Sequence, residues 1–282
     1  MWALREEYLD WLRARNYSSD TLRCQSNDLR RFLTWCDERS LSEPTEVTQP
    51  IIERYQRWLY YHRRTDGRPL SFRSQHHLLC SVKSFFRWMT RQHLTLFNPA
   101  SEIELPRRGL RLPRDILTAE EADWVINQPD IQTALGIRDH AILETFYSTG
   151  VRRKELAHLT LYDLDAARGV LMVREGKNLR DRVVPIGERA LAWVDKYVTD
   201  VRPDFVVEPD GGALFLTADG NPFSQLSRLS EMVRKYLVQA KIEKKGGCHI
   251  FRHYAESRIM PSPDLLYPGV APVVSAMAGH TP

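Results

Sequence analysis

A break in composition at residues 98–117 constrains the fold of this chain more than any other feature. The segment, NPASEIELPRRGLRLPRDIL, carries three prolines and a glycine, so it cannot form one long regular helix. Apolar residues recur at helical spacings before it, whereas short β-branched runs occur only after it. The sequence therefore predicts a helical domain over residues 1–97, a basic interdomain linker over 98–117 and a second domain over 118–282.

Four helices and no strand are expected in the first domain. Apolar residues lie mostly three, four or seven positions apart within 22–36, and Ser and Asp residues at 18–20 supply start signals. Similar patterns cover residues 1–15, a segment beginning near Thr48 with Pro50 in its first turn, and residues 71–92. A small four-helix bundle follows from this pattern.

The second domain mixes helices with a short sheet. Thr118 and Glu121 form a capping-box pattern at its start. The runs GVLMVREG (169–176) and DRVVPIG (181–187) predict a β-hairpin, and helical spacing is present at 139–147, 188–197 and 225–241. We therefore expect a mainly α fold, with the four-helix domain followed by a mostly helical domain that carries a small β-hairpin or sheet.

Charge is spread unevenly along the chain. Residues 1–116 hold 20 Lys and Arg against 14 Asp and Glu, and Lys83 is the only lysine among them. Arginine suits phosphate oxygens and stacks on bases, which makes nucleic acid a plausible partner, although solvated helix faces have similar compositions. The four cysteines form no CxxC pair, and there is no secretory signal or membrane-length apolar run, so we expect thiols in the cytoplasm.

Two polar motifs could bind an anion. In STGVRRKELAHLTL (148–161), Arg152 and Glu155 are three apart and share a helix face, as either an aimed arginine or an ordinary surface ion pair. In REGKNLRDRVVPIG (174–187), Lys177 is expected at the hairpin tip close to Arg180 and Arg182. Clustered positive charge lowers a lysine pKa, which suits a proton donor, but an ordinary polar turn has the same composition.

The stretch HIFRH (249–253) allows three interpretations: a zinc site, part of a core, or half of an anion clamp. Ile250 stands where a zinc protease carries glutamate, so we expect no metal site. His249 and Arg252 share a face, with Ile250 and Phe251 directed to the core. A final motif, AGHTP, contributes His280.

The order of these motifs resembles that of the tyrosine recombinases, in particular bacterial chromosomal and phage or integron-type integrases. TGVRRKEL is similar to the family's TGxRxxEL, GKNLRDRVVPI to its GKGxKxRxVPL hairpin, HIFRH to HxxRH and AGHTP to LGH. The linker is similar to the family's NPA…LPR junction, and the first domain to its core-binding domain. The resemblance covers roughly residues 5–253.

This resemblance implies strand breakage and rejoining on double-stranded DNA through a 3′-phosphotyrosyl bond, without metal, ATP or other cofactor. It implies catalytic roles for Arg152, Lys177, His249, Arg252 and His280, with Glu155 orienting Arg152. The expected DNA-binding residues are Arg107, Arg108, Arg111, Arg114, Arg180 and Arg182. Homo- or hetero-tetramers on DNA, near the nucleoid, and a link to mobile elements are also implied.

The resemblance stops after His253. Four prolines follow within residues 261–272, and Arg252 and His280 lie 28 residues apart, farther than in the family. The family's nucleophilic tyrosine follows its Gly-His by about nine residues, a position not present here, and Tyr254 and Tyr267 do not match it. A truncated or frame-shifted recombinase, a DNA-binding protein without cleavage, and a tyrosine supplied by another protomer are the open interpretations.

Overall fold

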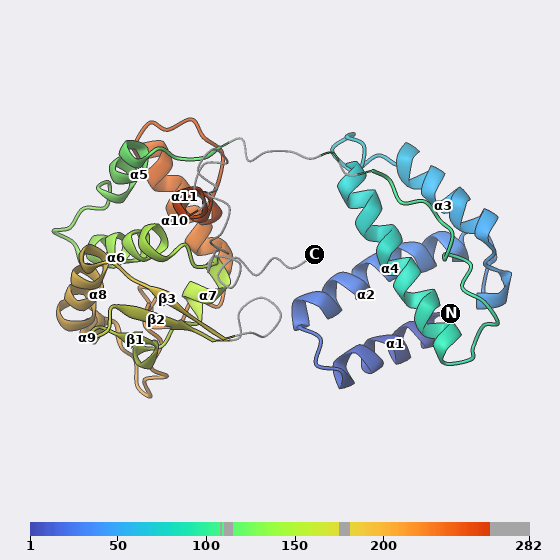
Figure 1. Ribbon diagram of the computed structural model, residues 1–282, viewed down its shortest axis with the longest axis horizontal. Coiled ribbons are helices and arrows are strands. Elements are labelled where there is room, and N and C mark those ends of the chain that lie inside the picture. The colour runs from blue at the N-terminus through green and yellow to red at the C-terminus, as the bar shows by residue number, and fades with distance from the viewer. Residues whose placement is uncertain (108, 110–114, 175–180, 260–282) are drawn as a thin grey trace, which may run out of the picture. The chain divides into compact units, whose positions relative to one another are not determined.

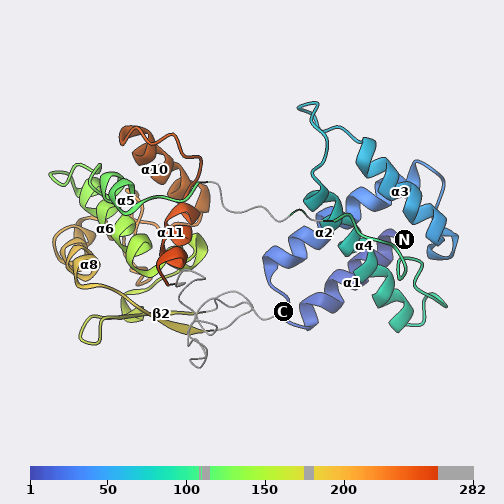
Figure 2. The same cartoon turned by 45° about the horizontal axis from the view of Figure 1, so that its top comes forward.

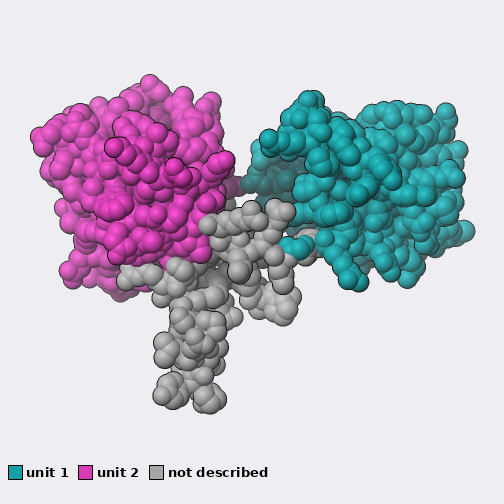
Figure 3. All heavy atoms as spheres, turned by 90° about the horizontal axis from the view of Figure 1, so that it is seen from above, with its two compact units in different colours: residues 1–111 teal, residues 112–282 magenta. Residues whose placement is uncertain are grey.

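The computed structural model describes residues 1–107, 109, 115–174 and 181–259. The chain divides into two compact units, Met1–Arg111 and Leu112–Pro282 (Figure 3). Each unit has a separate hydrophobic core. Residues 1–111 form unit 1 and residues 112–282 form unit 2.

Unit 1 is built from four α-helices and a short 3-10 helix (Figure 1). Two of the helices begin where a serine caps the chain: the Thr21 N–H donates to Ser18 Oγ, and the Ser74 N–H donates to Ser71 Oγ. The elements are α1 (Trp2–Ala14), α2 (Ser19–Asp37), η1 (Pro44–Glu46), α3 (Gln49–Tyr61) and α4 (Phe72–Arg91). The four predicted helices are confirmed.

Aromatic side chains fill the core of unit 1. Phe32 of α2, Tyr55 of α3 and Phe86 of α4 are fully buried, and the Phe32 ring meets the other two nearly edge-on. The beginning of the proline-rich segment also packs here, because Ala100 and Ile103 are buried in the same core. Unit 1 thus extends past its last helix into residues 98–106.

Unit 2 holds the remaining elements. They are α5 (Ala119–Ile126), α6 (Ala134–Thr149), α7 (Arg153–Ala157), η2 (Leu161–Asp163), β1 (Leu164–Asp165), β2 (Val170–Val173), β3 (Arg182–Pro185), α8 (Glu188–Asp200), α9 (Arg202–Phe205), α10 (Leu226–Gln239) and α11 (His249–Ile259). The capping box at the start of α5 is confirmed, since Thr118 and Glu121 each accept a hydrogen bond from the other's backbone N–H.

The small sheet of unit 2 is antiparallel, with strand order β1-β2-β3. The predicted hairpin is confirmed, with Val173 of β2 opposite Arg182 of β3. Strand β1 was not predicted, because two residues are too few for a period-two pattern to show. Residues 175–180, which carry Lys177 and Arg180, lie between β2 and β3 and outside the described residues.

Helix α6 is the central element of unit 2. It contacts α5, α8, α11 and β3, and most of its side chains are buried, charged ones included. Figure 2 shows α5, α8 and α11 around it. Arg138 donates to Asp139, which also accepts from the Tyr236 hydroxyl at 2.7 Å. Glu144 pairs with Arg189 of α8 at 2.8 Å. Paired charges of this kind can be buried, whereas isolated ones could not.

The predicted fold class, mainly α with a small sheet, is confirmed. All four cysteines are thiols: Cys36 and Cys248 are buried, while Cys24 is exposed. Among the described helices, none combines the length and apolar character that a membrane crossing requires.

Candidate active site and nucleic-acid interface

The turn between α6 and α7 is the base on which the site is built. Helix α6 ends at Gly150, whose φ of +60° is a left-handed conformation that favours glycine. A Cβ at Gly150 would come within 2.8 Å of the Ala255 Cβ on α11. Glycine is therefore required twice, once for the turn and once so that α11 can pack against it.

Arg152 follows this turn and is held by Glu155. The Arg152 N–H donates to Glu155 Oε2 at 2.7 Å, which caps the first turn of α7, and Arg152 Nη1 donates to Oε1 at 2.8 Å. The Glu155 side chain is 5% exposed and that of Arg152 is 30% exposed. The guanidinium is thus anchored at one end while part of it faces solvent.

A second arginine reaches the same carboxylate from the sheet. Arg182 of β3 donates through Nη1 to Glu155 Oε1 at 2.9 Å and through Nη2 to Oε2 at 2.7 Å. Burial alone would raise the pKa of Glu155, but the hydrogen bonds from Arg182 and Arg152 outweigh it and lower the pKa to about 2. The carboxylate is therefore ionised throughout the physiological range.

Helix α11 carries the HIFRH motif with the predicted division of faces. Ile250 and Phe251 are buried in the core of unit 2, whereas His249 is exposed and Arg252 is half-buried. Arg252 Nη1 donates to the Gly150 carbonyl oxygen at 2.9 Å, although the two residues are 102 positions apart in sequence. The guanidinium groups of Arg252 and Arg152 are therefore both organised around one turn.

The start of α11 is packed closely on α10. A Cβ at Gly247 would lie 3.1 Å from the Cβ of Ser230, and Ser230 Oγ accepts a 2.7 Å hydrogen bond from Arg153 of α7. Arg153 thereby links α7 to α10, against which Gly247, two residues before α11, is packed. This contact was not predicted, because nothing in the local sequence around Arg153 indicates its partner.

His249 is a weak base in this setting. Partial desolvation lowers the pKa of its imidazole, and the nearby His253, Arg153 and Arg234 lower it further. The ring is therefore neutral at pH 7, able to accept a proton or to donate one N–H. Within the described residues no group of three or more His, Cys, Asp and Glu side chains is arranged to hold a metal ion.

The predicted site residues lie partly inside and partly outside the described residues. Of the expected DNA-binding arginines, Arg107 is described and exposed, and Arg182 lies against Glu155. Outside the described residues are Lys177, Arg180, His280, Arg108, Arg111 and Arg114. The structure thus brings Arg152 and Arg182 together on Glu155 and ties Arg252 to the Gly150 turn, while His249 lies on the same helix as Arg252.

Two tyrosines lie against each other between α6 and α11. The rings of Tyr147 and Tyr254 stack with centroids 5.1 Å apart, and their hydroxyl oxygens are 3.2 Å apart. Tyr254 is 6% exposed, and the guanidinium of Arg189 lies over the Tyr147 ring. The Tyr254 hydroxyl is thus engaged by Tyr147 and largely buried.

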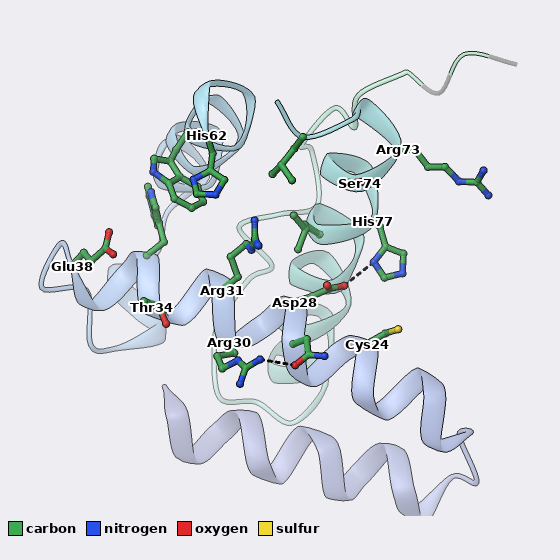
Figure 4. Close-up of a pocket in the computed structure, with 15 residues that line it drawn as sticks. Cys24, Asp28, Arg30, Arg31, Thr34, Glu38, His62, Arg73, Ser74 and His77 are labelled. Carbon is green, nitrogen blue, oxygen red and sulfur yellow. Dashed lines mark hydrogen bonds and ion pairs between the residues drawn. The ribbon is translucent and has the colours of Figure 1, made fainter. Parts of the chain in front are cut away.

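Unit 1 contains a large basic pocket that the sequence did not locate (Figure 4). Its volume is about 910 Å³, and residues of α2, α3 and α4 line it. Arg31 projects into the space between the helices, while Arg73 at the start of α4 points outward. Asp28 is engaged by His77 Nδ1 at 2.8 Å and by Ser81 Oγ at 2.7 Å.

The charge of this pocket is positive. Arg30, Arg31 and Arg73 outnumber Asp28 and Glu38, so the lining carries a net charge of +1 when its histidines are neutral. The arginine excess of residues 1–116 signals such a surface without locating it, because α2 and α4 meet only in the folded unit. A basic, partly aromatic concavity suits an anionic polymer.

Comparison with known families gives matches to both parts of the chain. Residues 115–263 match the phage integrase family, and residues 4–96 match the N-terminal SAM-like domain of phage integrases. Tyrosine recombinase XerC 2 of Ralstonia nicotianae is 44% identical over 88% of this chain and 71% of its own length. Tyrosine recombinase XerD of Chlorobaculum tepidum is 31% identical over 98% of this chain and 87% of its own length.

Solved structures of low sequence identity share the fold. The integrase of transposon Tn1549, in complex with a circular intermediate DNA, superposes with a TM-score of 0.66 at 18% identity, over 91% of this chain and 86% of that one. A λ integrase dimer bound to a COC′ core site gives 0.64 at 15% identity, over 91% and 88%. The family matches and the two recombinase relatives show that the chain belongs to the phage integrase family of tyrosine recombinases.

Proposed function

We propose that this chain is a site-specific recombinase that binds duplex DNA and holds a scissile phosphate between Arg152 and Arg252. The observation that supports this most strongly is their common base. Arg152 lies two residues after Gly150 in the sequence, and Arg252 donates to the Gly150 carbonyl oxygen at 2.9 Å. Two guanidinium groups organised around one turn suit the non-bridging oxygens of one phosphate group.

The proposed chemistry is phosphoryl transfer to a tyrosine. The tyrosine hydroxyl gives its proton to a general base and its oxygen attacks phosphorus. The bond to the 5′ oxygen breaks and that oxygen takes a proton, which leaves a 3′-phosphotyrosyl bond and a 5′-hydroxyl. Rejoining reverses these steps, so no nucleotide cofactor is consumed. The transition state gains negative charge, and each aimed donor contributes about 3–4 kcal/mol to lowering its barrier.

Each site residue has a proposed role in this reaction. Arg152 and Arg252 bind the phosphate oxygens, and Glu155 orients Arg152. His249, neutral at pH 7 because its pKa is lowered, serves as general acid/base or as a further donor. Lys177 and His280, outside the described residues, are proposed as the proton donor to the 5′ oxygen and as an additional phosphate donor.

DNA binding is proposed for both units. In unit 1 we propose that the basic pocket around Arg31 contacts DNA phosphates. The linker arginines Arg107, Arg108, Arg111 and Arg114, of which the structure describes Arg107 alone, are proposed as further phosphate contacts. The λ integrase structures include a dimer on a core site and a tetramer on a Holliday junction. We extend this to our chain and propose that it assembles as a homo- or hetero-tetramer on cytoplasmic DNA.

A nucleophilic tyrosine would have to lie close to the Arg152 and Arg252 guanidinium groups. Among the described residues, the tyrosine that follows HIFRH is Tyr254, and its hydroxyl is engaged by Tyr147. This placement supports an alternative in which the chain occupies recombination sites without cutting them. In both functions Arg152 and Arg252 bind a DNA phosphate. The two differ only in whether a phosphotyrosyl bond forms.

A two-step experiment separates them. Selection from randomised duplexes first identifies a bound site, and a nicked duplex with that site then traps any covalent adduct, because the short cleaved strand diffuses away. Adduct with the native chain, lost in Arg252→Met, supports the recombinase. Site-specific binding without adduct at saturating protein supports the binding protein, and no duplex binding at low salt contradicts both.

A further inference from the structure

Glu155 is shared by two arginines that use it differently. Its two carboxylate oxygens accept four hydrogen bonds of 2.7–2.9 Å, two from Arg152 and two from Arg182. Arg182 engages it through both terminal nitrogens, in the bidentate geometry that is strongest for arginine and carboxylate. Arg152 uses one terminal nitrogen and its backbone N–H.

This difference decides which arginine is available to a ligand. Within the described residues, Glu155 is the only carboxylate that pairs with the Arg152 guanidinium, and that guanidinium has five N–H donors in all. The Arg182 side chain is 19% exposed, against 30% for Arg152. Arg182 is thus the more enclosed and the more fully engaged of the two.

The charges of this triad sum to +1. If Arg182 were absent, the carboxylate of Glu155 would neutralise Arg152, and the pair would present no net charge to a phosphate. Because Glu155 is buried, the effective dielectric around it is low and its charge acts strongly on the neighbouring Arg152 guanidinium. Arg182 therefore determines how much net positive charge Arg152 presents to a phosphate.

We propose that Arg182 is a positioning residue that offsets the charge of Glu155 and fixes its two oxygens, so that Arg152 presents its full positive charge to a DNA phosphate. The inference rests on the proposed function, because the phosphate is that of the proposed substrate. It differs from direct DNA binding by Arg182, since here Arg182 acts through Glu155.

The same contact joins the hairpin to the site. Arg182 stands opposite Val173 at the end of the β2–β3 ladder, next to the segment that carries Lys177. Its side chain reaches 27 residues back to α7. Arg182 thus holds the base of the hairpin against the turn that positions Arg152.

A charge-rescue experiment tests the proposal on the full chain. The variants are Arg182→Met, Glu155→Gln and the double variant, with Arg174→Met as control. Arg174 is a matched control because it also pairs with a buried carboxylate, Asp163, at 2.6 Å. Affinity for a random duplex of about 40 base pairs is measured by fluorescence anisotropy across a salt series.

We expect Arg182→Met to bind duplex about tenfold more weakly and to reduce the salt slope by about one, although Arg182 itself contacts no phosphate. The double variant should return to within about threefold of the native chain, because Arg152 regains its net charge. A double variant as weak as Arg182→Met, or an Arg182→Met variant that binds like the native chain or the control, would overturn the proposal.

Two additions keep the outcome interpretable. If Arg182→Met fails to fold by circular dichroism, Arg182→Lys replaces it. This variant keeps the positive charge and should bind duplex within about threefold of the native chain, whereas a loss of about tenfold would contradict the proposal. Stabilisation by inorganic phosphate, measured as a Tm shift, is compared in parallel. If the native chain binds no duplex, the proposed function fails. The inference about Arg182 is then tested by the Tm shift alone: it is supported if Arg182→Met loses the phosphate-induced shift and the double variant regains it, and contradicted if the two variants behave alike.

Discussion

Replacing Gly150 by alanine tests the packing that supports both arginines. The substitution meets two separate penalties. An L-residue in the left-handed region costs about 1 kcal/mol, and a Cβ only 2.8 Å from the Ala255 Cβ forces the backbone or α11 to shift, which costs about 1–3 kcal/mol more. We therefore expect a loss of about 3 kcal/mol in the free energy of unfolding of unit 2.

Gly169 provides the matched control. It lies in the same unit with a φ of +62°, but a Cβ there would meet its nearest atom, the Ile186 carbonyl oxygen, at an ordinary 3.5 Å. Gly169→Ala should therefore cost only the backbone penalty, about 1 kcal/mol. In calorimetry this corresponds to a Tm decrease of roughly 2–4 °C for Gly169→Ala and roughly 6–12 °C for Gly150→Ala.

A double variant isolates the contact. Ala255→Gly alone should cost about 1 kcal/mol as a helix-interior glycine, and combining it with Gly150→Ala should recover the steric part of the loss. Because the Gly150 carbonyl accepts from Arg252, Gly150→Ala should also weaken duplex binding. Equal Tm decreases for the Gly150 and Gly169 variants would refute the reasoning.

Three further predictions concern the same unit. The Glu155 pKa is lowered from an ordinary 4.5 to about 2, so the ionised carboxylate stabilises the folded state by about 3 kcal/mol above pH 4.5. This stabilisation is lost as the pH falls toward 2. The free energy of unfolding of Glu155→Gln, measured in urea, should lack this pH dependence. NMR titration should find the His249 pKa below 6.5, and Arg234→Met should raise it, whereas an unchanged value would contradict a contribution from Arg234. Thr118→Ala, which removes the cap of α5, should cost about 1 kcal/mol in urea unfolding, and a loss under about 0.3 would exclude a role for the cap.

Local sequence patterns predicted the elements that depend on neighbours along the chain. The four helices of unit 1, the cap at Thr118 and the β2–β3 hairpin are confirmed, because spacing, capping residues and β-branched runs act over a few residues. The two faces of HIFRH were predicted for the same reason. Its helical period places Ile250 and Phe251 inward and His249 outward.

The sequence pattern did not predict that most side chains of α6 are buried. Its sequence mixes charged and apolar residues without a clear polar face, and the charges are buried because partners come from α8 and α10. The basic pocket of unit 1 is a similar case, since its lining comes from three helices. Surfaces assembled from several elements leave only a compositional trace in the sequence, here the arginine excess.

The sequence by itself determined that this chain has a helical N-terminal part, a mixed C-terminal part and an ordered set of arginine, lysine and histidine motifs of the recombinase type. Only the tertiary structure decided which of these side chains meet. Arg252 reaches Gly150 across 102 residues, and Arg182 engages Glu155 across 27. The physical reason is that hydrogen bonds and charge pairing act over a few ångströms in space, while sequence patterns report only on neighbours along the chain.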